Sequence, residues 1–151
     1  LVMGGHGDTM VPLPRFTKIS GKSIDQLINN GKISKKRLEE IVQRTRDGGA
    51  EIIKLLEKGS AFYAPAASGV EMAESYLKDL KKLLPCAAYL NGEYGFDKIY
   101  AGVPVIIGGK GVEKIEELQL NEFEKKKFEH SINAVKGLWE DACKIDGDLT
   151  K

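Results

Sequence analysis

The sequence predicts an α+β domain in which long helices pack on antiparallel strands and a final helix closes the fold. Apolar residues recur every three or four positions over two long segments between residues 35 and 84, which is the spacing of a helix face. Residues 86–115 are rich in β-branched and aromatic side chains and are broken by glycine-containing turns, which favours an antiparallel meander. A third helical pattern follows. Hairpin, helices, strands and helix in this order are typical of an α+β domain.

The first elements are short and lie on either side of a histidine turn. The chain opens in an apolar run with Leu1 rather than an initiator methionine, so we expect it to be part of a longer polypeptide. The run breaks at Gly4 and Gly5, presents His6, and returns to apolar residues at Val11. Alternation around Ser20-Gly21 then predicts a hairpin, and residues 25–30 predict a small helix.

Two long helices are expected next. The first begins after Ser34, a residue suited to an N-cap, and ends at Gly59. Gly48 and Gly49 lie inside it at a cost of about 1 kcal/mol each relative to alanine, so we expect a kink or the close approach of another backbone there. The second helix is expected from Pro65 to Leu84 and to be stopped by Pro85.

The last helix has the clearest start signal in the sequence. Asn121 followed by Glu124 three residues later is the pattern of a capping box. Its predicted apolar stripe consists of Phe128, Ile132, Val135, Leu138, Trp139 and Ala142. This helix is expected to close the fold over the strands.

The composition narrows the function classes. A chain of 151 residues that is 42% hydrophobic fits one domain with its own core. Its 23 Lys and Arg against 22 Asp and Glu give no field that attracts nucleic acid or an anionic membrane, and the longest apolar stretch, at residues 101–107, is far short of the about 20 residues of a membrane span. Cys86 and Cys143 lack the paired spacing of a zinc site, so we expect no metal site and a reducing, cytoplasmic location.

His6 is the strongest candidate for chemistry. Imidazole alone among side chains ordinarily titrates near neutrality, and the flanking glycines let a substrate approach it closely. A purely structural role is the alternative. Asp8 is a poor orienting partner because residues two apart in an extended segment lie side by side. His130, among charged residues of the last helix, is expected to be a solvated surface residue.

Two further motifs have an ordinary structural interpretation beside a functional one. "IIGGKGVEKI" lacks the spacing of a phosphate-binding loop and is better interpreted as a hairpin turn. "SAFYAPAASG" is compatible with a pocket wall beside a flat ring or with tight helix packing, and composition does not decide between them. No G-x-G-x-x-G motif follows a strand, so another domain would have to hold any dinucleotide.

Three segments together resemble the C-terminal, substrate-binding domain of the lactate/malate dehydrogenase family: "VMGGHGDTMVPL", "TRDGGAEIIKLLEKGSAFYAPAAS" and "GVPVIIGGKGVEKIEELQLNEFEKKKFEHS". The resemblance covers essentially the whole chain, in order, and is closest to bacterial members that use malate. It implies that His6 is the catalytic acid/base, that Pro65 covers the nicotinamide ring of NAD, and that Ala61 replaces a larger threonine and leaves room for a dicarboxylate.

The resemblance also implies what residues 1–151 do not contain. In this family the NAD-binding Rossmann domain, the substrate arginines and the aspartate that orients the histidine precede the segment that begins at Leu1. Because that aspartate and one of the arginines belong to the substrate-binding domain itself, we expect residues 1–151 to be this domain truncated at its N-terminal end. It implies NAD-dependent interconversion of (S)-malate and oxaloacetate by the complete, homo-oligomeric enzyme, a dimer or tetramer, and an inactive isolated chain. A lactate or other 2-hydroxy acid dehydrogenase, and a non-catalytic binding or oligomerisation module, are the alternatives.

Overall fold

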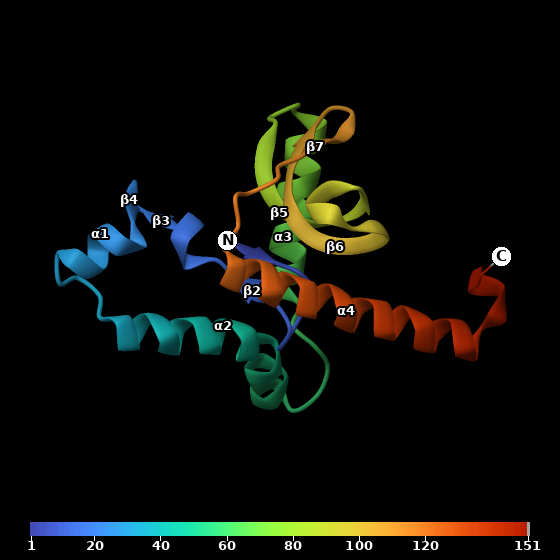
Figure 1. Ribbon diagram of the computed structural model, residues 1–151, viewed down its shortest axis with the longest axis horizontal. Helices are drawn as coiled ribbons and strands as arrows, with labels where there is room; N and C mark the ends of the chain where they lie inside the picture. Colours follow the sequence, from blue (N-terminus) through green and yellow to red (C-terminus); the bar gives the residue numbers. More distant parts are fainter. Residues whose placement is uncertain (151) are drawn as a thin grey trace.

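The computed structural model describes residues 1–150 and has the expected α+β architecture, with four α-helices and antiparallel strands in the described part (Figure 1). The first half contains β1 (Val2–Met3), β2 (Val11–Pro12), η1 (Pro14–Phe16), β3 (Lys18–Ile19), β4 (Lys22–Ser23), α1 (Ile24–Asn29) and α2 (Lys35–Leu56). The second half contains α3 (Tyr63–Leu77), β5 (Lys82–Asn91), η2 (Glu93–Gly95), β6 (Asp97–Gly108), β7 (Gly111–Ile115), α4 (Glu122–Ile145) and η3 (Gly147–Thr150). The predicted hairpin and small helix are confirmed as β3–β4 and α1.

The core lies between the β5–β6–β7 sheet and the first half of α4. The three strands are antiparallel neighbours in chain order, which confirms the predicted meander. Strand β6 supplies several buried apolar residues, and Phe128 and Ile132 of α4 pack against them. Tyr94 and Phe96 stack edge-on against the Phe128 ring at centroid distances of 5.2 and 5.7 Å. The sheet therefore provides a rigid base for the segments that pack on it.

Helix α4 begins as predicted but is buried over only part of its length. The Asn121 side chain accepts from the Glu124 N–H and the Glu124 carboxylate accepts from the Asn121 N–H, which confirms the capping box. The Arg15 guanidinium also binds Glu124 and keeps the pKa of that carboxyl below its usual range. Leu138 and Trp139 are 71% and 54% exposed, because the second half of α4 extends past the sheet (Figure 1). The predicted stripe is thus buried only at its start.

Helix α3 is shorter than predicted, and the prediction that Pro85 stops it is wrong. The helix ends at Leu77, after which Asp79 and Lys81 take positive φ angles of 49° and 53° and reverse the chain. Pro85 lies inside β5, opposite Pro104. Because β5 is an edge strand, a residue without an N–H is tolerated there. Pairing with β6 therefore outweighs the helical spacing of the apolar residues up to Leu84.

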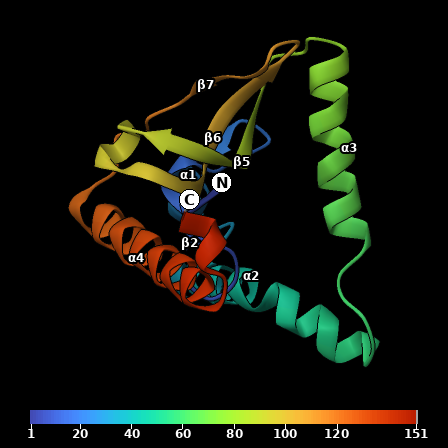
Figure 2. The ribbon, with the colours of Figure 1, turned by 90° about the vertical axis from the view of Figure 1, so that its right-hand side faces the viewer.

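Ser75 fixes the connection from α3 to the sheet. Its side chain is fully buried, donates to the Ile107 carbonyl at 2.7 Å and accepts from the Lys82 N–H at 3.2 Å. The rest of α3 is largely exposed, and Figure 2 shows it on the other side of the β5–β6 hairpin from α4. Its small-residue face is therefore not tightly packed against another helix within residues 1–150, contrary to one of the two interpretations of that segment.

Helix α2 follows its predicted cap and contains the glycine pair. Ser34 accepts from the Arg37 N–H, which confirms the N-cap, and the helix runs to Leu56 without a fully buried residue. The ribbon bends in its second half (Figure 1). No backbone approaches the glycines: a Cβ built on Gly48 meets nothing within 4 Å, and one built on Gly49 lies 3.9 Å from the His6 Nε2 atom. Of the two alternatives expected at the glycine pair, the structure therefore shows a bend in this half of the helix and not the approach of another backbone. Within residues 1–150, no helix is both long enough and apolar enough to cross a bilayer.

Candidate active site

The histidine turn is a seven-residue connection, residues 4–10, between two paired strands. Val2 lies opposite Pro12 and Met3 opposite Val11, so the two ends of the turn are held together. Gly4 and Gly7 both have φ angles of 87°, a region that favours glycine. The Met10 N–H donates to the Gly7 carbonyl at 3.0 Å and tightens the second half. The glycines therefore allow a compact turn with His6 at its exposed side.

The beginning of the turn is fixed to the sheet through Gly102 of β6. The Gly4 N–H donates to the Gly102 carbonyl at 2.8 Å, and the Gly102 N–H donates back to the Gly4 carbonyl at 2.9 Å. A Cβ built on Gly102 would lie 2.6 Å from the Gly4 carbonyl oxygen, closer than real Cβ contacts come. Glycine at position 102 is therefore required for this approach of the two backbones.

Gly102→Ala should push the histidine turn away from the sheet. We expect a loss of about 1–3 kcal/mol in the free energy of unfolding, measured by chemical denaturation, because the added methyl has no space. Gly137→Ala in α4 is the matched control: its added Cβ meets nothing within 4 Å, so stability should rise slightly with helix propensity. A Gly102→Ala protein as stable as wild type would show that the two backbones do not pack this closely.

Two helices hold the turn on either side of His6. The Gly5 N–H donates to the Ser131 hydroxyl oxygen of α4 at 2.8 Å. At the other end, the Arg46 Nε of α2 donates to the Met10 carbonyl at 3.2 Å. Ser131, Arg46 and Gly102 are not among the site residues that the sequence predicts. For Ser131 a signal was present, since it lies beside Ile132 and three residues after Phe128, on the face of α4 that the apolar stripe predicts to be buried.

The His6 imidazole is accessible and lies beside a cavity of about 350 Å³ between the turn and the sheet. Pro85 and Cys86 of β5 and Tyr100 of β6 contribute to its wall. Burial, together with the charge of Glu71, raises the pKa of the Cys86 thiol, so this thiol stays protonated near neutral pH and is a poor nucleophile. The imidazole is therefore the group in this cavity suited to move a proton.

The other predicted site residues do not join His6. Ala61 is half-buried in the loop after α2. Pro65 lies in the first turn of α3, which confirms its predicted position at a helix start, and its side chain is exposed. Neither lines the cavity beside His6. His130 is exposed, as expected. Within residues 1–150, no carboxylate forms an ion pair with His6, and Asp8 is itself exposed. The described residues thus supply the imidazole and its support but no orienting acid.

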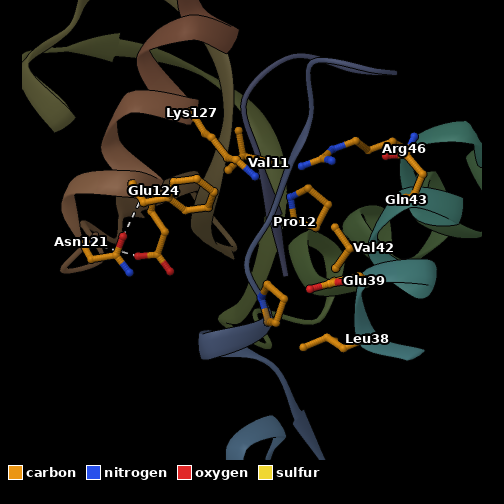
Figure 3. Close-up of a pocket in the computed structure, with 12 residues that line it drawn as sticks. Val11, Pro12, Leu38, Glu39, Val42, Gln43, Arg46, Asn121, Glu124 and Lys127 are labelled. Carbon is orange, nitrogen blue, oxygen red and sulfur yellow. Dashed lines mark hydrogen bonds between the residues drawn. The ribbon is translucent and has the colours of Figure 1, made fainter. Parts of the chain in front are cut away.

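A larger cavity, of about 510 Å³, lies between α2 and the start of α4 and is also lined by Val11 and Pro12 of β2 (Figure 3). Figure 3 shows Arg46 extending from α2 toward Val11. Burial, followed by the charge of Arg46, lowers the pKa of Lys127 on the opposite wall. Glu124 already binds Arg15 and caps α4. This cavity does not contain His6, and Asn121, Glu124 and Arg46 in its wall already make hydrogen bonds within the fold, so the histidine turn remains the candidate active site.

Comparison with known proteins identifies the family of this chain. The family model of the lactate/malate dehydrogenase, alpha/beta C-terminal domain matches residues 1–144. The chain belongs to the lactate/malate dehydrogenase family. It resembles the malate dehydrogenase of Pelagibacter ubique with 75% identity over 151 residues, which is 100% of this chain and 47% of that protein. It resembles the malate dehydrogenase of Cereibacter sphaeroides with 58% identity over 98% of the chain and 46% of that protein.

Solved members of the lactate/malate dehydrogenase family have the same fold. The lactate dehydrogenase of Eimeria maxima, solved with NADH and oxamate, superposes with a TM-score of 0.92 at 46% identity, over 97% of this chain and 46% of that one. The malate dehydrogenase of Salinibacter ruber gives a TM-score of 0.90 at 47% identity, over 98% and 47%. The chain therefore spans about half the length of the family members it matches.

Proposed function

We propose that residues 1–151 are the substrate-binding, catalytic C-terminal domain of an NAD-dependent malate dehydrogenase. The complete enzyme interconverts (S)-malate and oxaloacetate, and His6 accepts and donates the proton. The observation that carries this proposal is an exposed imidazole on a glycine-framed turn that the sheet and two helices hold in place. The names of the relatives from Pelagibacter and Cereibacter support malate as the substrate.

The chemistry of His6 follows from its two protonation states. A neutral imidazole accepts the hydroxyl proton of malate as the C–H bond breaks, and the imidazolium returns that proton to the carbonyl oxygen of oxaloacetate in reverse. Well-placed proton transfer typically contributes about 10²–10⁴-fold to a rate. The fixed turn adds to this, because a positioned reacting group removes part of the entropic barrier. The proposed role of His6 therefore depends on the imidazole ring, which transfers the proton, and on the fixed backbone, which positions it.

The residues described here fit the nicotinamide end of NAD and not its phosphates. When bound, NAD supplies the site that accepts a hydride from malate. Pro65 is exposed at the start of α3 and offers an apolar contact for a flat ring. No Gly-rich turn of the G-x-G-x-x-G type follows a strand in residues 1–151. We therefore place the phosphate contacts in an NAD-binding domain that precedes this one in the complete polypeptide, as the length of the relatives supports.

Ala61 is proposed to face the distal carboxylate of the substrate. Ala61→Thr in the complete enzyme should crowd that end, and we expect kcat/KM for oxaloacetate to fall by about 10–200-fold, the range for a methyl-sized change in a pocket. The efficiency with pyruvate, which lacks the second carboxylate, should fall less. Ala73→Thr, on the exposed side of α3, is the control. An unchanged ratio of the two efficiencies would remove Ala61 from the substrate site and favour another 2-hydroxy acid.

The complete enzyme is proposed to be a cytoplasmic homo-oligomer, a dimer or tetramer. Exposed apolar side chains on α2 and α3 support this proposal, because another subunit could cover them. Leu55, Tyr63 and Leu77 are 75%, 90% and 78% exposed. Both cysteines are free, which fits a reducing compartment. A non-catalytic binding module would use the same apolar surface. Assay of the complete protein with malate and NAD separates the two functions, because the binding module would give no NADH.

A further inference from the structure

Ser131 is a polar residue in a place where an apolar one would be expected. It is fully buried in α4, beside Ile132 and one turn after Phe128, and both of these residues belong to the core. Burying a hydroxyl costs free energy unless a hydrogen bond compensates it. The compensating partner is not in the helix but in the histidine turn, where the Gly5 N–H donates to Ser131 Oγ at 2.8 Å.

The turn is packed directly against this hydroxyl. A Cβ built on Gly4 would collide with Ser131 Oγ, and one built on Gly5 would lie 3.1 Å from Val135 Cγ2 and 3.6 Å from Ser131 Oγ. Both glycines therefore allow the backbone to reach α4. The residue that follows Gly5 is His6, so the contact restrains the peptide unit immediately before the imidazole.

The position of the His6 imidazole depends on the backbone that carries it. Within residues 1–150, the His6 side chain has no hydrogen-bond or ion-pair partner of its own. Gly4, Gly5 and Gly7 surround it, and glycine has the widest choice of backbone angles. Without external contacts such a segment samples many conformations. The contacts that remove this freedom are therefore what places the imidazole.

We propose that Ser131 is a positioning residue for His6, which acts by holding the Gly5 peptide and takes no part in proton transfer. This inference rests on the proposed role of His6 as acid/base. A displacement of about 1 Å in a reacting group costs up to about 10² in rate. Loss of the hydroxyl leaves the Gly5 N–H without an acceptor and releases the turn at the point where it carries the imidazole.

The test uses the complete enzyme with Ser131→Ala. We expect kcat to fall by about 10-fold to about 10²-fold in both directions, with the dissociation constant for NADH within about two-fold of wild type. Ser131→Cys places a weak acceptor near the same position in a slightly larger side chain and suits a buried site, so it should stay folded and lose kcat in the same sense. Two folded variants with wild-type kcat would overturn the proposal.

Ser75→Ala is the matched control. Ser75 is also fully buried and also accepts a backbone N–H, from Lys82, but it lies at the end of α3 and does not contact the histidine turn. Its loss should lower the melting temperature about as much as Ser131→Ala does while kcat stays within about two-fold. An equal loss of kcat in both variants would mean that general destabilisation, and not positioning, explains the effect.

A double variant separates this inference from the function on which it rests. If Ser131 acts through His6, adding Ser131→Ala to His6→Asn should cause no further loss of turnover beyond about two-fold. A further ten-fold loss would overturn the positioning role. Wild-type turnover in His6→Asn itself would instead refute the proposed function, whereas an inactive His6→Asn beside a fully active Ser131→Ala would refute only the role of Ser131.

Discussion

His6→Asn in the complete enzyme is expected to lower turnover by at least about 10² in both directions while NADH affinity stays nearly unchanged. Asparagine has a similar size and retains some hydrogen bonding, but it cannot accept or release a proton near neutrality. The proposed position of the phosphate contacts outside residues 1–151 explains why cofactor affinity should be spared. Steady-state kinetics together with titration of NADH measure the two effects separately.

His130→Asn is the control for this substitution. His130 is exposed on α4, and we expect its replacement to leave turnover within about two-fold of wild type. Equal losses in the two variants would indicate a general effect of replacing histidine. A His6→Asn enzyme that keeps most of its turnover would exclude His6 from the chemistry.

The 151-residue chain expressed by itself is expected to give no detectable turnover of malate and no submicromolar binding of NADH. It carries no dinucleotide fingerprint. Its arginines also have other engagements: Arg15 binds Glu124, Arg37 binds Glu40, Arg44 binds Glu51, and Arg46 donates to the Met10 carbonyl. A dicarboxylate therefore finds no free guanidinium beside His6 in the described part of the chain.

Calorimetric titration with NADH and a coupled assay test this expectation. The complete enzyme, prepared in parallel, is the positive control, and any trace of it must be removed from the shorter chain. Submicromolar binding, or activity that survives this removal, would contradict the assignment of the phosphate contacts and the substrate arginines to residues outside 1–151.

Local signals account for the parts of the fold that the sequence predicts well. The Ser34 cap and the Asn121–Glu124 capping box depend on groups three residues apart, so the amino-acid order alone contains them. The turn at Gly108 is equally local. His6 is recognisable for the same reason, because its glycines are its neighbours in the chain.

Long-range packing accounts for the rest. The end of α3 depends on pairing of β5 with β6, which the helical spacing up to Leu84 does not reveal. Exposure of Trp139 depends on where the sheet ends beneath α4. Gly102 and Ser131 lie 98 and 126 residues from the turn positions that they contact, Gly4 and Gly5, so no local motif joins them. The support of His6 is thus visible only in three dimensions.

The pH dependence of both reaction directions, measured on wild type and His6→Asn from about pH 5.5 to about pH 9, tests the acid/base role of His6 most directly. Reduction of oxaloacetate requires the imidazolium, so its wild-type rate should fall toward the alkaline end of this range. Oxidation of malate requires the neutral ring, so its rate should fall toward the acidic end. His6→Asn should lose both dependences along with its turnover. Wild-type and variant enzymes with the same two profiles and similar rates would contradict the proposed mechanism.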